Sequence, residues 1–386
     1  MERSAMAIFI ATVSLGAPAS AATLQTLFSD QTTDQVLFAA DLNNDGDAND
    51  EGEVRVFFDG TNASGLVAPT QNVFQLTQSA AGDVYIGDGT TDTVYRLRDK
   101  NGNDNAQDAG EASIWFSADN VNGFALNTAN GVAVGGDGAL YVVEADTRGN
   151  PSGDVVYRTH DLNGDGDAND AGESSIWLDL GALDASSSPF EIAFDGDAAF
   201  ITDTAGGNPR IYRAEDVDGS GKIESDEVVE FVAQGDAPFA LALSASNGNL
   251  FAQDVFTDGL LRYNDANGDG HIDVVSEAFN IWDSTSFADG AIFDFAIDGD
   301  HGLVPSNQYD DNDKILALFD KNGDGDFLDA NETTTFLSFG AQGDYPQRPR
   351  SVAFYSSVAP VPLPASILFL AGALGGLGVW RRRQST

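Results

Sequence analysis

The sequence predicts an all-β protein folded as a six-bladed β-propeller of four-stranded blades, closed by a blade that takes strands from both ends of the chain. Three observations lead to this prediction. Acidic loops of similar sequence recur six times, at intervals of 49 to 62 residues. Strand-like segments flank each loop in the same order. The first repeat lacks its first strand, and a matching extra strand follows the last repeat. A repeat of about 50 residues with four strands is typical of propeller blades.

The third acidic loop, Asp161–Glu173, shows the pattern most clearly. It reads DLNGDGDANDAGE, with oxygen-bearing side chains at positions 1, 3, 5 and 7, glycine at position 6 and a closing glutamate. Calcium takes six to eight oxygen ligands at flexible angles, and this alternation is the layout of a calcium-binding loop. We find no amphipathic helices beside it, so we expect a strand-connecting calcium loop rather than an EF-hand.

The other five loops span residues 41–53, 99–111, 216–227, 265–277 and 320–332, and nearly half of the 61 acidic residues lie in the six loops. The alternative is an acidic, glycine-rich hairpin without metal. A loop with so many acids repels itself, so a bound Ca²⁺ would stabilise it and fix the start of the next strand. The candidate Ca²⁺ ligands are Asp41, Asn43, Asp45, Asp47, Glu53, Asp99, Asn101, Asn103, Glu111, Asp161, Asn163, Asp165, Asp167, Glu173, Asp216, Asp218, Ser220, Glu227, Asp265, Asn267, Asp269, Glu277, Asp320, Asn322, Asp324, Asp326 and Glu332.

Segments with alternating apolar residues flank every loop, which predicts strands. The segment before the loop reads VLFAAD, VYRLRD, VYRTHD, IYRAED, LLRYND or ILALFD, and the one after it reads VRVFF, ASIWF, SSIWL, VVEFV, AFNIW or TTTFL. Paired segments around a tight turn, such as IAFDGDAAFITD, lie further upstream. Each unit is therefore expected to contain strand A, strand B, strand C, the calcium loop and strand D.

The two ends of the repeat predict how the ring closes. The first unit begins with its strand B, at residues 24–29, and its missing strand A is found after the sixth strand D, at residues 351–355. A blade assembled from both ends removes the free sheet edges of an open ring.

One unit, PFEIAFDGDAAFITDTAGGNPRIYRAED, resembles the NHL-type repeats of six-bladed propellers, in the Asp that ends strand B and in the Ile-Tyr-Arg of strand C. The resemblance extends over residues 24–355, and a calcium loop between strands C and D departs from the family pattern. NHL-like propellers have varied functions, so the resemblance implies the fold alone.

Two further sets of residues recur once per blade and leave alternatives open. An aromatic residue in strand D is expected to pack between neighbouring sheets, although a stripe of them could also stack on sugars. An acid or amide that ends strand B is expected to cap its own B–C turn, although a ring of acids could hold an axial metal. The aromatic set is Phe57, Trp115, Trp177, Phe231, Trp282 and Phe336, and the strand B set is Asp30, Asp88, Glu144, Asp203, Asp254 and Asn307.

Both ends of the chain are predicted to be targeting signals, which leaves residues 22–356 as the propeller. Residues 1–21 combine Arg3, a short apolar run and a small-residue cleavage site at residues 19–21, which is typical of a secretory signal peptide.

Residues 357–386 contain VPLPA at 361–365, the apolar span ILFLAGALGGLGVW and three arginines at 381–383. This tail resembles the PEP-CTERM class of sorting signals in its VPLPA variant. The resemblance implies a Gram-negative bacterium, processing by an exosortase-type enzyme, and a transmembrane helix that anchors the protein in the inner membrane before processing. The alternative is a plain membrane anchor, although 16 residues from Ala365 to Trp380 span only about 24 Å at 1.5 Å per residue.

Composition limits the function further. A net charge of −43 argues against nucleic-acid binding, and the absence of cysteine excludes disulfides and thiolate metal sites. The first hypothesis is an exported, non-enzymatic calcium-binding protein of the cell surface or extracellular matrix that binds exopolysaccharide or surface proteins. The alternative is a calcium-dependent hydrolase of lactones, esters or phosphoesters, with an axial acidic metal site.

Overall fold

The computed structural model describes residues 24–69, 72–145, 153–284, 291–307, 313–339 and 348–357. The signal peptide and the VPLPA motif, apolar span and arginines of the sorting signal lie outside these residues, so both remain predictions. Among the described residues, no helix is long and apolar enough to cross a membrane.

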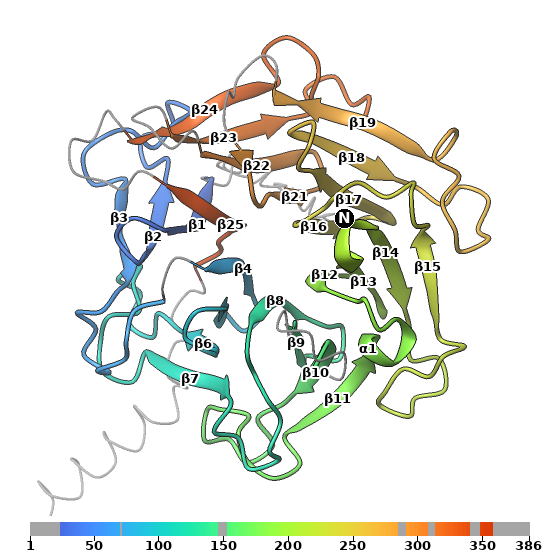
Figure 1. Ribbon diagram of the computed structural model, residues 1–386. Helices are drawn as coiled ribbons and strands as arrows, with labels where there is room; N and C mark the ends of the chain where they lie inside the picture. Colours follow the sequence, from blue (N-terminus) through green and yellow to red (C-terminus); the bar gives the residue numbers. More distant parts are fainter. Residues whose placement is uncertain are drawn as a thin grey trace, which may run out of the picture.

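The described residues form an all-β, six-bladed propeller of antiparallel blades arranged around a central axis (Figure 1). Strand A of each blade lies nearest the axis and strand D outermost, because the A strands of neighbouring blades contact one another. The strands of blades 1 to 3, in the order A to D, are β25 (Pro349–Phe354), β1 (Gln25–Asp30), β2 (Gln35–Ala40) and β3 (Val54–Phe58); β4 (Val73–Gln78), β5 (Val84–Asp88), β6 (Thr93–Leu97) and β7 (Ala112–Ser117); β8 (Ala129–Val134), β9 (Leu140–Glu144), β10 (Val155–Thr159) and β11 (Ser174–Asp179).

Blades 4 to 6 continue the same order. Their strands are β12 (Pro189–Asp195), β13 (Ala198–Asp203), β14 (Arg210–Ala214) and β15 (Val228–Val232); β16 (Leu243–Ser246), β17 (Asn249–Asp254), β18 (Gly259–Tyr263) and β19 (Ala278–Asp283); and β20 (Ala291–Ile292) with β21 (Ala296–Asp298), β22 (His301–Asn307), β23 (Lys314–Phe319) and β24 (Thr333–Ser338). The one irregular strand A is that of blade 6, which is divided into β20 and β21. Two single-turn helices, α1 (Leu180–Leu183) and the 3₁₀ helix Ala205–Gly207, lie in connections.

The predicted closure of the ring is confirmed. The strand β25 near the C-terminus pairs antiparallel with β1, with Thr26 opposite Phe354 and Leu27 opposite Ala353. It also contacts β22 of blade 6 and β4 of blade 2. The first and last described strands therefore form one sheet, and the chain ends hold the ring together.

The core lies between neighbouring sheets, and the strand D aromatics belong to it. All six are buried, with exposed fractions from 0% for Phe57 to 5% for Trp115. Each of three packs edge-on against a ring of strand B: Trp115 on Tyr85, Trp177 on Tyr141 and Phe231 on Phe200. Packing is thus confirmed for this set, and these rings form no exposed platform for sugars.

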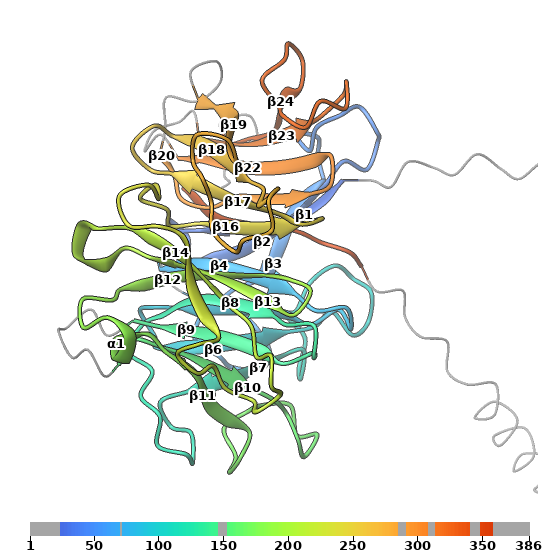
Figure 2. The ribbon, with the colours of Figure 1, turned by 90° about the vertical axis from the view of Figure 1, so that its right-hand side faces the viewer.

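Strand direction separates the connections onto two faces of the ring. Because successive strands of a blade are antiparallel, the A–B turns and C–D loops share one face, and the B–C and D–A connections share the other. Figure 2 shows α1, in a D–A connection, on the side opposite to the start of β1. The N–H of Tyr355 donates to the carbonyl of Gln25, so both ends of the described propeller leave it on the C–D face.

Glycine is required where strand A of blade 3 approaches strand A of blade 4. A Cβ at Gly131 in β8 would lie 2.9 Å from Glu191 Cα and 2.9 Å from the carbonyl oxygen of Phe190, both in β12. These are backbone atoms, so neither can move aside without shifting the neighbouring blade.

We therefore expect Gly131→Ala to lower the free energy of unfolding by about 1–3 kcal/mol, the usual cost of overpacking a core. Chemical denaturation measures this. Gly60→Ala is the matched control, because its Cβ would meet its nearest neighbour, Ala68 Cβ, at an ordinary 3.7 Å. A loss for Gly131→Ala no larger than that of the control would contradict the close approach.

Candidate metal centres

Each of the six acidic loops connects strand C to strand D of its blade, as predicted. The loop at 41–53 joins β2 to β3, and the loop at 161–173 joins β10 to β11; the other four occupy the same place in their blades. In every loop the backbone carbonyl of the closing glutamate accepts an N–H from the residue before the loop, at 2.8–3.1 Å. The loops are therefore closed at their base by the first rung of the C–D ladder.

The aspartate at position 1 organises the bend. Its Oδ2 accepts the N–H of position 6 in all six loops, at 2.8–3.0 Å. Position 6 has a positive φ throughout, which glycine adopts without strain. The second loop has Asp104 there, with φ of 57°, so this loop makes the same turn with a residue that bears it less easily.

Side chains at positions 3 and 5 lie along the inside of the bend. The position 5 oxygen accepts the N–H of position 7 in all six loops, at 3.0–3.3 Å. In five loops the position 3 oxygen accepts the N–H of position 5, at 2.8–2.9 Å. Alternate side chains thus turn their oxygens toward the same side of the loop.

The closing glutamate is largely occupied with the backbone of its own loop. In the third loop, Glu173 is 3% exposed, and its Oε1 accepts the N–H of Leu162 at 2.9 Å while its Oε2 accepts that of Asp170 at 3.3 Å. The corresponding glutamates of the other five loops make the same pair of bonds. In four loops Oε1 also accepts the N–H of position 3, at 3.2–3.4 Å. Oε2 keeps a second lone pair, so the glutamate can still serve as a ligand through that oxygen.

A further acid at position 9 or 10 joins the cluster, and the sequence reasoning did not include it. In four loops the amide of the position 3 asparagine donates to it, at 2.5–2.7 Å. Rotating this amide by 180° would turn its oxygen to the same point, so a cation there would meet oxygen from both residues. The acid recurs in every loop at nearly constant spacing, and this recurrence is the feature of the sequence that could have identified it as a ligand. The set is Asp50, Asp108, Asp170, Glu224, Asp273 and Asp329.

The donor set suits a hard divalent cation. Carboxylate oxygens of Asp165, Asp167 and Glu173 lie within 4.8 Å of one another, as do those of Asp216, Asp218 and Glu227. These clusters contain only oxygen donors, which calcium prefers. Desolvation and repulsion from Asp165 and Glu173 raise the pKa of the exposed Asp170, so the acids are close enough to oppose one another's charge. The structure thus brings together acidic groups that fit a metal ion, and the identity of that ion remains a prediction.

The loops also join the blades to one another. The N–H of position 8 donates, at 2.6–2.8 Å, to a carbonyl in strand D of the preceding blade. The pairs are Ala48 to Phe336, Ala106 to Phe57, Ala168 to Trp115, Ile223 to Trp177, Ile272 to Phe231 and Phe327 to Ile281. The first of these pairs joins blade 1 to blade 6, so the contact runs around the whole ring.

The accepting residue has the same special place in each blade. It is the extra residue of a β-bulge in the C–D ladder: in blade 2, Val94 pairs with Phe116 and Tyr95 with Ile114, which leaves Trp115 between them without a partner. The other five C–D ladders shift register at the equivalent residue. A bulged residue has a carbonyl unpaired in its own sheet, and the loop of the next blade supplies the missing donor.

Polar and charged side chains reinforce this contact in several blades. Arg262 of blade 5 donates to the carbonyl of Gly325 in the loop of blade 6, at 2.6 Å. Arg55 of blade 1 lies 3.2 Å from Asp104 in the loop of blade 2. His271 Nδ1 lies 2.9 Å from the carbonyl oxygen of Glu230 in blade 4. The bend of the loop and its contact with the preceding blade therefore depend on each other.

The acids that end strand B bond to nearby backbone, which supports turn capping over an axial metal ring. Asp30 accepts the N–H groups of Thr32 and Thr33, and Asp88 accepts that of Thr90. Glu144 instead holds the D–A connection through the N–H groups of residues 127 and 128, and burial raises its pKa to about 7. Among the described residues, none of these acids belongs to a cluster able to hold a metal.

Comparisons with known proteins show the fold and no more. No family model and no curated protein matches the chain. A chain in a crystal structure of a nidogen–laminin complex aligns with a TM-score of 0.55 and 13% identity, covering 87% of this chain and 99% of that one. A putative 6-phosphogluconolactonase from Bacteroides uniformis aligns with a TM-score of 0.48 and 14% identity, over 86% and 99% of the two chains. The calcium-binding protein regucalcin from Agrobacterium tumefaciens aligns at 0.44 and 14%, over 68% and 74%.

The loops should differ in calcium affinity, with the second the weakest. It has Asp99 with two asparagines at positions 3 and 5, Lys100 beside them, and Asp104 at the bend, whereas the third has two aspartates and glycine. Affinity in such loops follows ligand charge and rigidity. We therefore expect Asp161→Asn to reduce calcium-dependent stability clearly more than Asp99→Asn does. Calcium titrations of thermal unfolding measure both, with the exposed, non-loop Asp119→Asn as control; equal losses would contradict the ranking.

Proposed function

We propose that this chain is an exported, non-enzymatic binding protein whose six-bladed propeller is stabilised by calcium. The observation that carries the proposal is the double role of the acidic loops. All six dock on the bulged strand D of the preceding blade, and the third and fourth also gather carboxylates within 4.8 Å of one another, a set suited to Ca²⁺. A cation that fixes the bend therefore also fixes a contact between blades.

Electrostatics indicate why the metal would matter for folding. Without cations, the acids of one loop repel one another at short range, and docking must hold them together. One Ca²⁺ in each loop would remove that repulsion and reduce the net charge from −43 to about −31. Extracellular calcium modules commonly bind at about 10⁻⁴–10⁻³ M, which suits a permanent structural ion in a calcium-rich medium.

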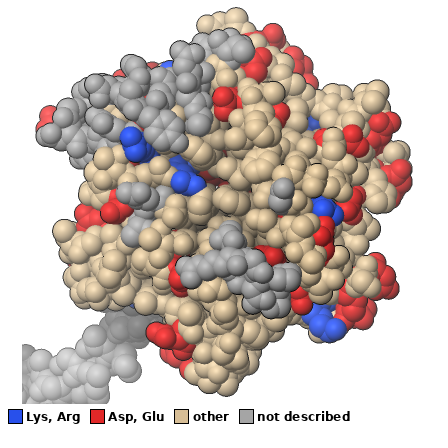
Figure 3. Space-filling model, viewed as in Figure 1, with Lys and Arg blue, Asp and Glu red and all other residues tan. Residues whose placement is uncertain are grey.

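The proposed partners are exopolysaccharide or other surface proteins, and the proposed location is the cell surface or matrix. Support comes from the predicted signal peptide and sorting tail, and from the place where the described chain ends. Because both ends leave on the C–D face, a tail anchored in the inner membrane before exosortase-type processing would direct the opposite face outward. That face carries the B–C and D–A connections, and in Figure 3 its acids lie mainly toward the rim.

The hydrolase alternative lacks support at its predicted position. It requires the strand B acids to converge on one axial metal, whereas Asp30, Asp88 and Asp254 each accept N–H groups of their own turns. A binding role is favoured because it needs no such centre.

Calcium should raise the thermal stability of the protein strongly. Ligand binding contributes about 2.7 kcal/mol per site at a hundredfold excess over Kd, so several sites together should shift the melting temperature by many degrees. Thermal unfolding in millimolar calcium and in excess chelator measures the shift. Magnesium at the same concentration controls for ionic strength. Equal melting temperatures in calcium and chelator would reject structural calcium.

Processing should remove both predicted signals. Mass spectrometry of the protein isolated from its native host should find an N-terminus near Ala22 and a C-terminus within or close to residues 361–366. Retention of Arg381–Arg383 would instead favour the plain membrane anchor.

A further inference from the structure

The A strands around the axis break the symmetry of the blades at one position. The position in question is the third residue of β25, β4, β8 and β12, the residue directly before β16, and a residue between β20 and β21. Following the chain from blade 1 to blade 6, it is occupied by Ser351, Gln75, Gly131, Glu191, Ala242 and Asp294. Large polar side chains in blades 2, 4 and 6 thus alternate with small residues in blades 3, 5 and 1. The repeat that governs the calcium loops does not require this alternation.

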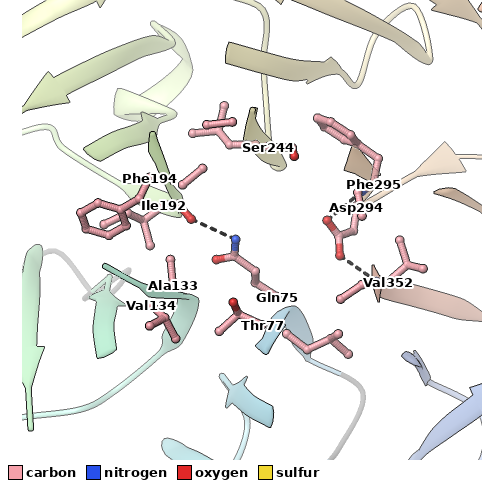
Figure 4. A pocket seen from close by; sticks show the side chains of 16 residues that line it. Gln75, Thr77, Ala133, Val134, Ile192, Phe194, Ser244, Asp294, Phe295 and Val352 are labelled. Atoms are coloured by element: carbon pink, nitrogen blue, oxygen red, sulfur yellow. Dashed lines mark hydrogen bonds between the residues drawn. The ribbon is translucent and has the colours of Figure 1, made fainter. Parts of the chain in front are cut away.

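Each of the three polar side chains reaches across to the next blade. Gln75 accepts the N–H of Val132 at 2.8 Å, Glu191 that of Leu243 at 2.9 Å, and Asp294 that of Val352 at 2.8 Å. Figure 4 shows the amide of Gln75 and the carboxylate of Asp294 beside the axial space. These side chains come from blades 2 and 6. The small residue of the next blade leaves room for each polar side chain to reach across.

The bonds satisfy Gln75 and Asp294 but leave Glu191 incomplete. Glu191 is fully buried, and its Oε1 has no hydrogen-bond partner within the described part of the chain. Burial raises the pKa of Glu191 well above its usual range, and the nearby Asp294 raises it further. Burial likewise raises the pKa of Asp294 to about 7. A buried acceptor without a donor is costly unless something binds it.

Counting the charges around the pair shows what is missing. Besides each other, both acids are acted on by the guanidinium of Arg350 in β25. His301 lies at the exposed start of β22. The strand β4 contributes the neutral Gln75. Arg350 is held over the rings of Phe74 and Phe293, 4.0 and 5.1 Å from their centroids. With both acids ionised, the cluster has a net charge of −1, so one further positive charge would balance it.

A cavity of about 220 Å³ borders this cluster at Asp294, whereas Glu191 is not among the residues that line it. Its lining includes Gln75 and Asp294 and extends along the A strands toward the A–B turns, on the side of the ring that carries the acidic loops. No Lys or Arg is among the residues that line it. Figure 4 shows the hydroxyls of Thr77 and Ser244 on opposite sides of it. Negative charge around a mouth concentrates cations and repels anions.

We propose that this axial cavity binds a small hydroxylated amine, with its ammonium group placed against Asp294 and its hydroxyls against Thr77, Ser244 and Gln75. The size agrees with such a ligand, because 220 Å³ corresponds to about seven waters at their liquid volume. The walls between the polar groups are mostly alanine, valine and phenylalanine, and they suit the carbon chain. This site is separate from the calcium loops and does not rest on the proposed function.

Binding should be linked to pH with a definite sign. Because its pKa is raised to about 7, Asp294 keeps its proton in the free protein up to about that pH. Above that pH the acid pair ionises and destabilises the fold. An alkylammonium ion, charged up to about pH 10 as lysine is, replaces that proton. The ligand should therefore bind more tightly at pH 8 than at pH 6, and should release a proton at the lower pH.

Isothermal titration calorimetry of the full chain in saturating calcium tests the site with a matched pair of probes. Glucamine and sorbitol differ only in that an amine replaces one hydroxyl. Glucamine should bind, and sorbitol should bind at least about tenfold more weakly, as expected when a charge-assisted hydrogen bond is lost. Asp294→Asn keeps an acceptor for Val352 and should weaken glucamine by a similar factor. Asp197→Asn, exposed in an A–B turn on the same face, should leave binding unchanged.

Each other outcome overturns the proposal. Absence of glucamine binding would show that the buried acids serve only the contacts between A strands. Equal binding of sorbitol, or of Asp294→Asn, would exclude recognition of the positive charge at this cluster. If Asp294→Asn fails to fold, the pH dependence of the unmutated protein decides. A glucamine affinity that does not increase from pH 6 to pH 8 would reject the site. Saturating calcium in every titration keeps these results independent of the loops.

Discussion

The ring depends on one hydrogen bond made six times, from the position 8 N–H of each acidic loop to the bulged carbonyl in strand D of the preceding blade. Strand D is the outer edge of its sheet, and an edge with unpaired backbone groups is prone to pair with other chains. The bulge turns one such group toward the neighbouring blade, and the loop occupies it. The same residue, most often Phe or Trp, also packs its side chain between sheets. Bulge, aromatic side chain and loop thus form one unit of structure.

Much of this architecture could be predicted from the sequence, because it repeats. The six loops predicted blade number and the C–D position, and the phase at Leu24 and at residues 351–355 predicted closure. The positive φ of Asp104 followed from its alignment with five glycines. Docking of the loops escaped prediction because it is a backbone contact, to which the identity of Ala48 or Ala106 gives no clue. The acids at positions 9 and 10 were not among the predicted ligands because they lie outside the pattern of alternate side-chain oxygens followed by a closing glutamate.

The axis escaped prediction for the opposite reason. Glu191 and Asp294 occur in two of six blades, so alignment of the repeats treats them as irregularities of strand A. Their relation appears only when blades are compared around the ring, where each large polar residue faces a small one in the next blade. The acids at the ends of strand B repeat well and serve their own turns and connections. In this propeller, repetition accompanies structural roles, and the departure from it marks the candidate ligand site.

The position of β25 has a mechanical consequence. This strand is the innermost of blade 1, runs along the axis, and ends at Phe354 on the face where the chain leaves. A pull on the chain beyond Ser356 is directed along the strand, whereas the hydrogen bonds to β1 lie across it. Such a load is shared by all the bonds of the ladder at once, instead of opening them one after another. The blade that closes the ring would therefore also carry the tension from the predicted membrane anchor.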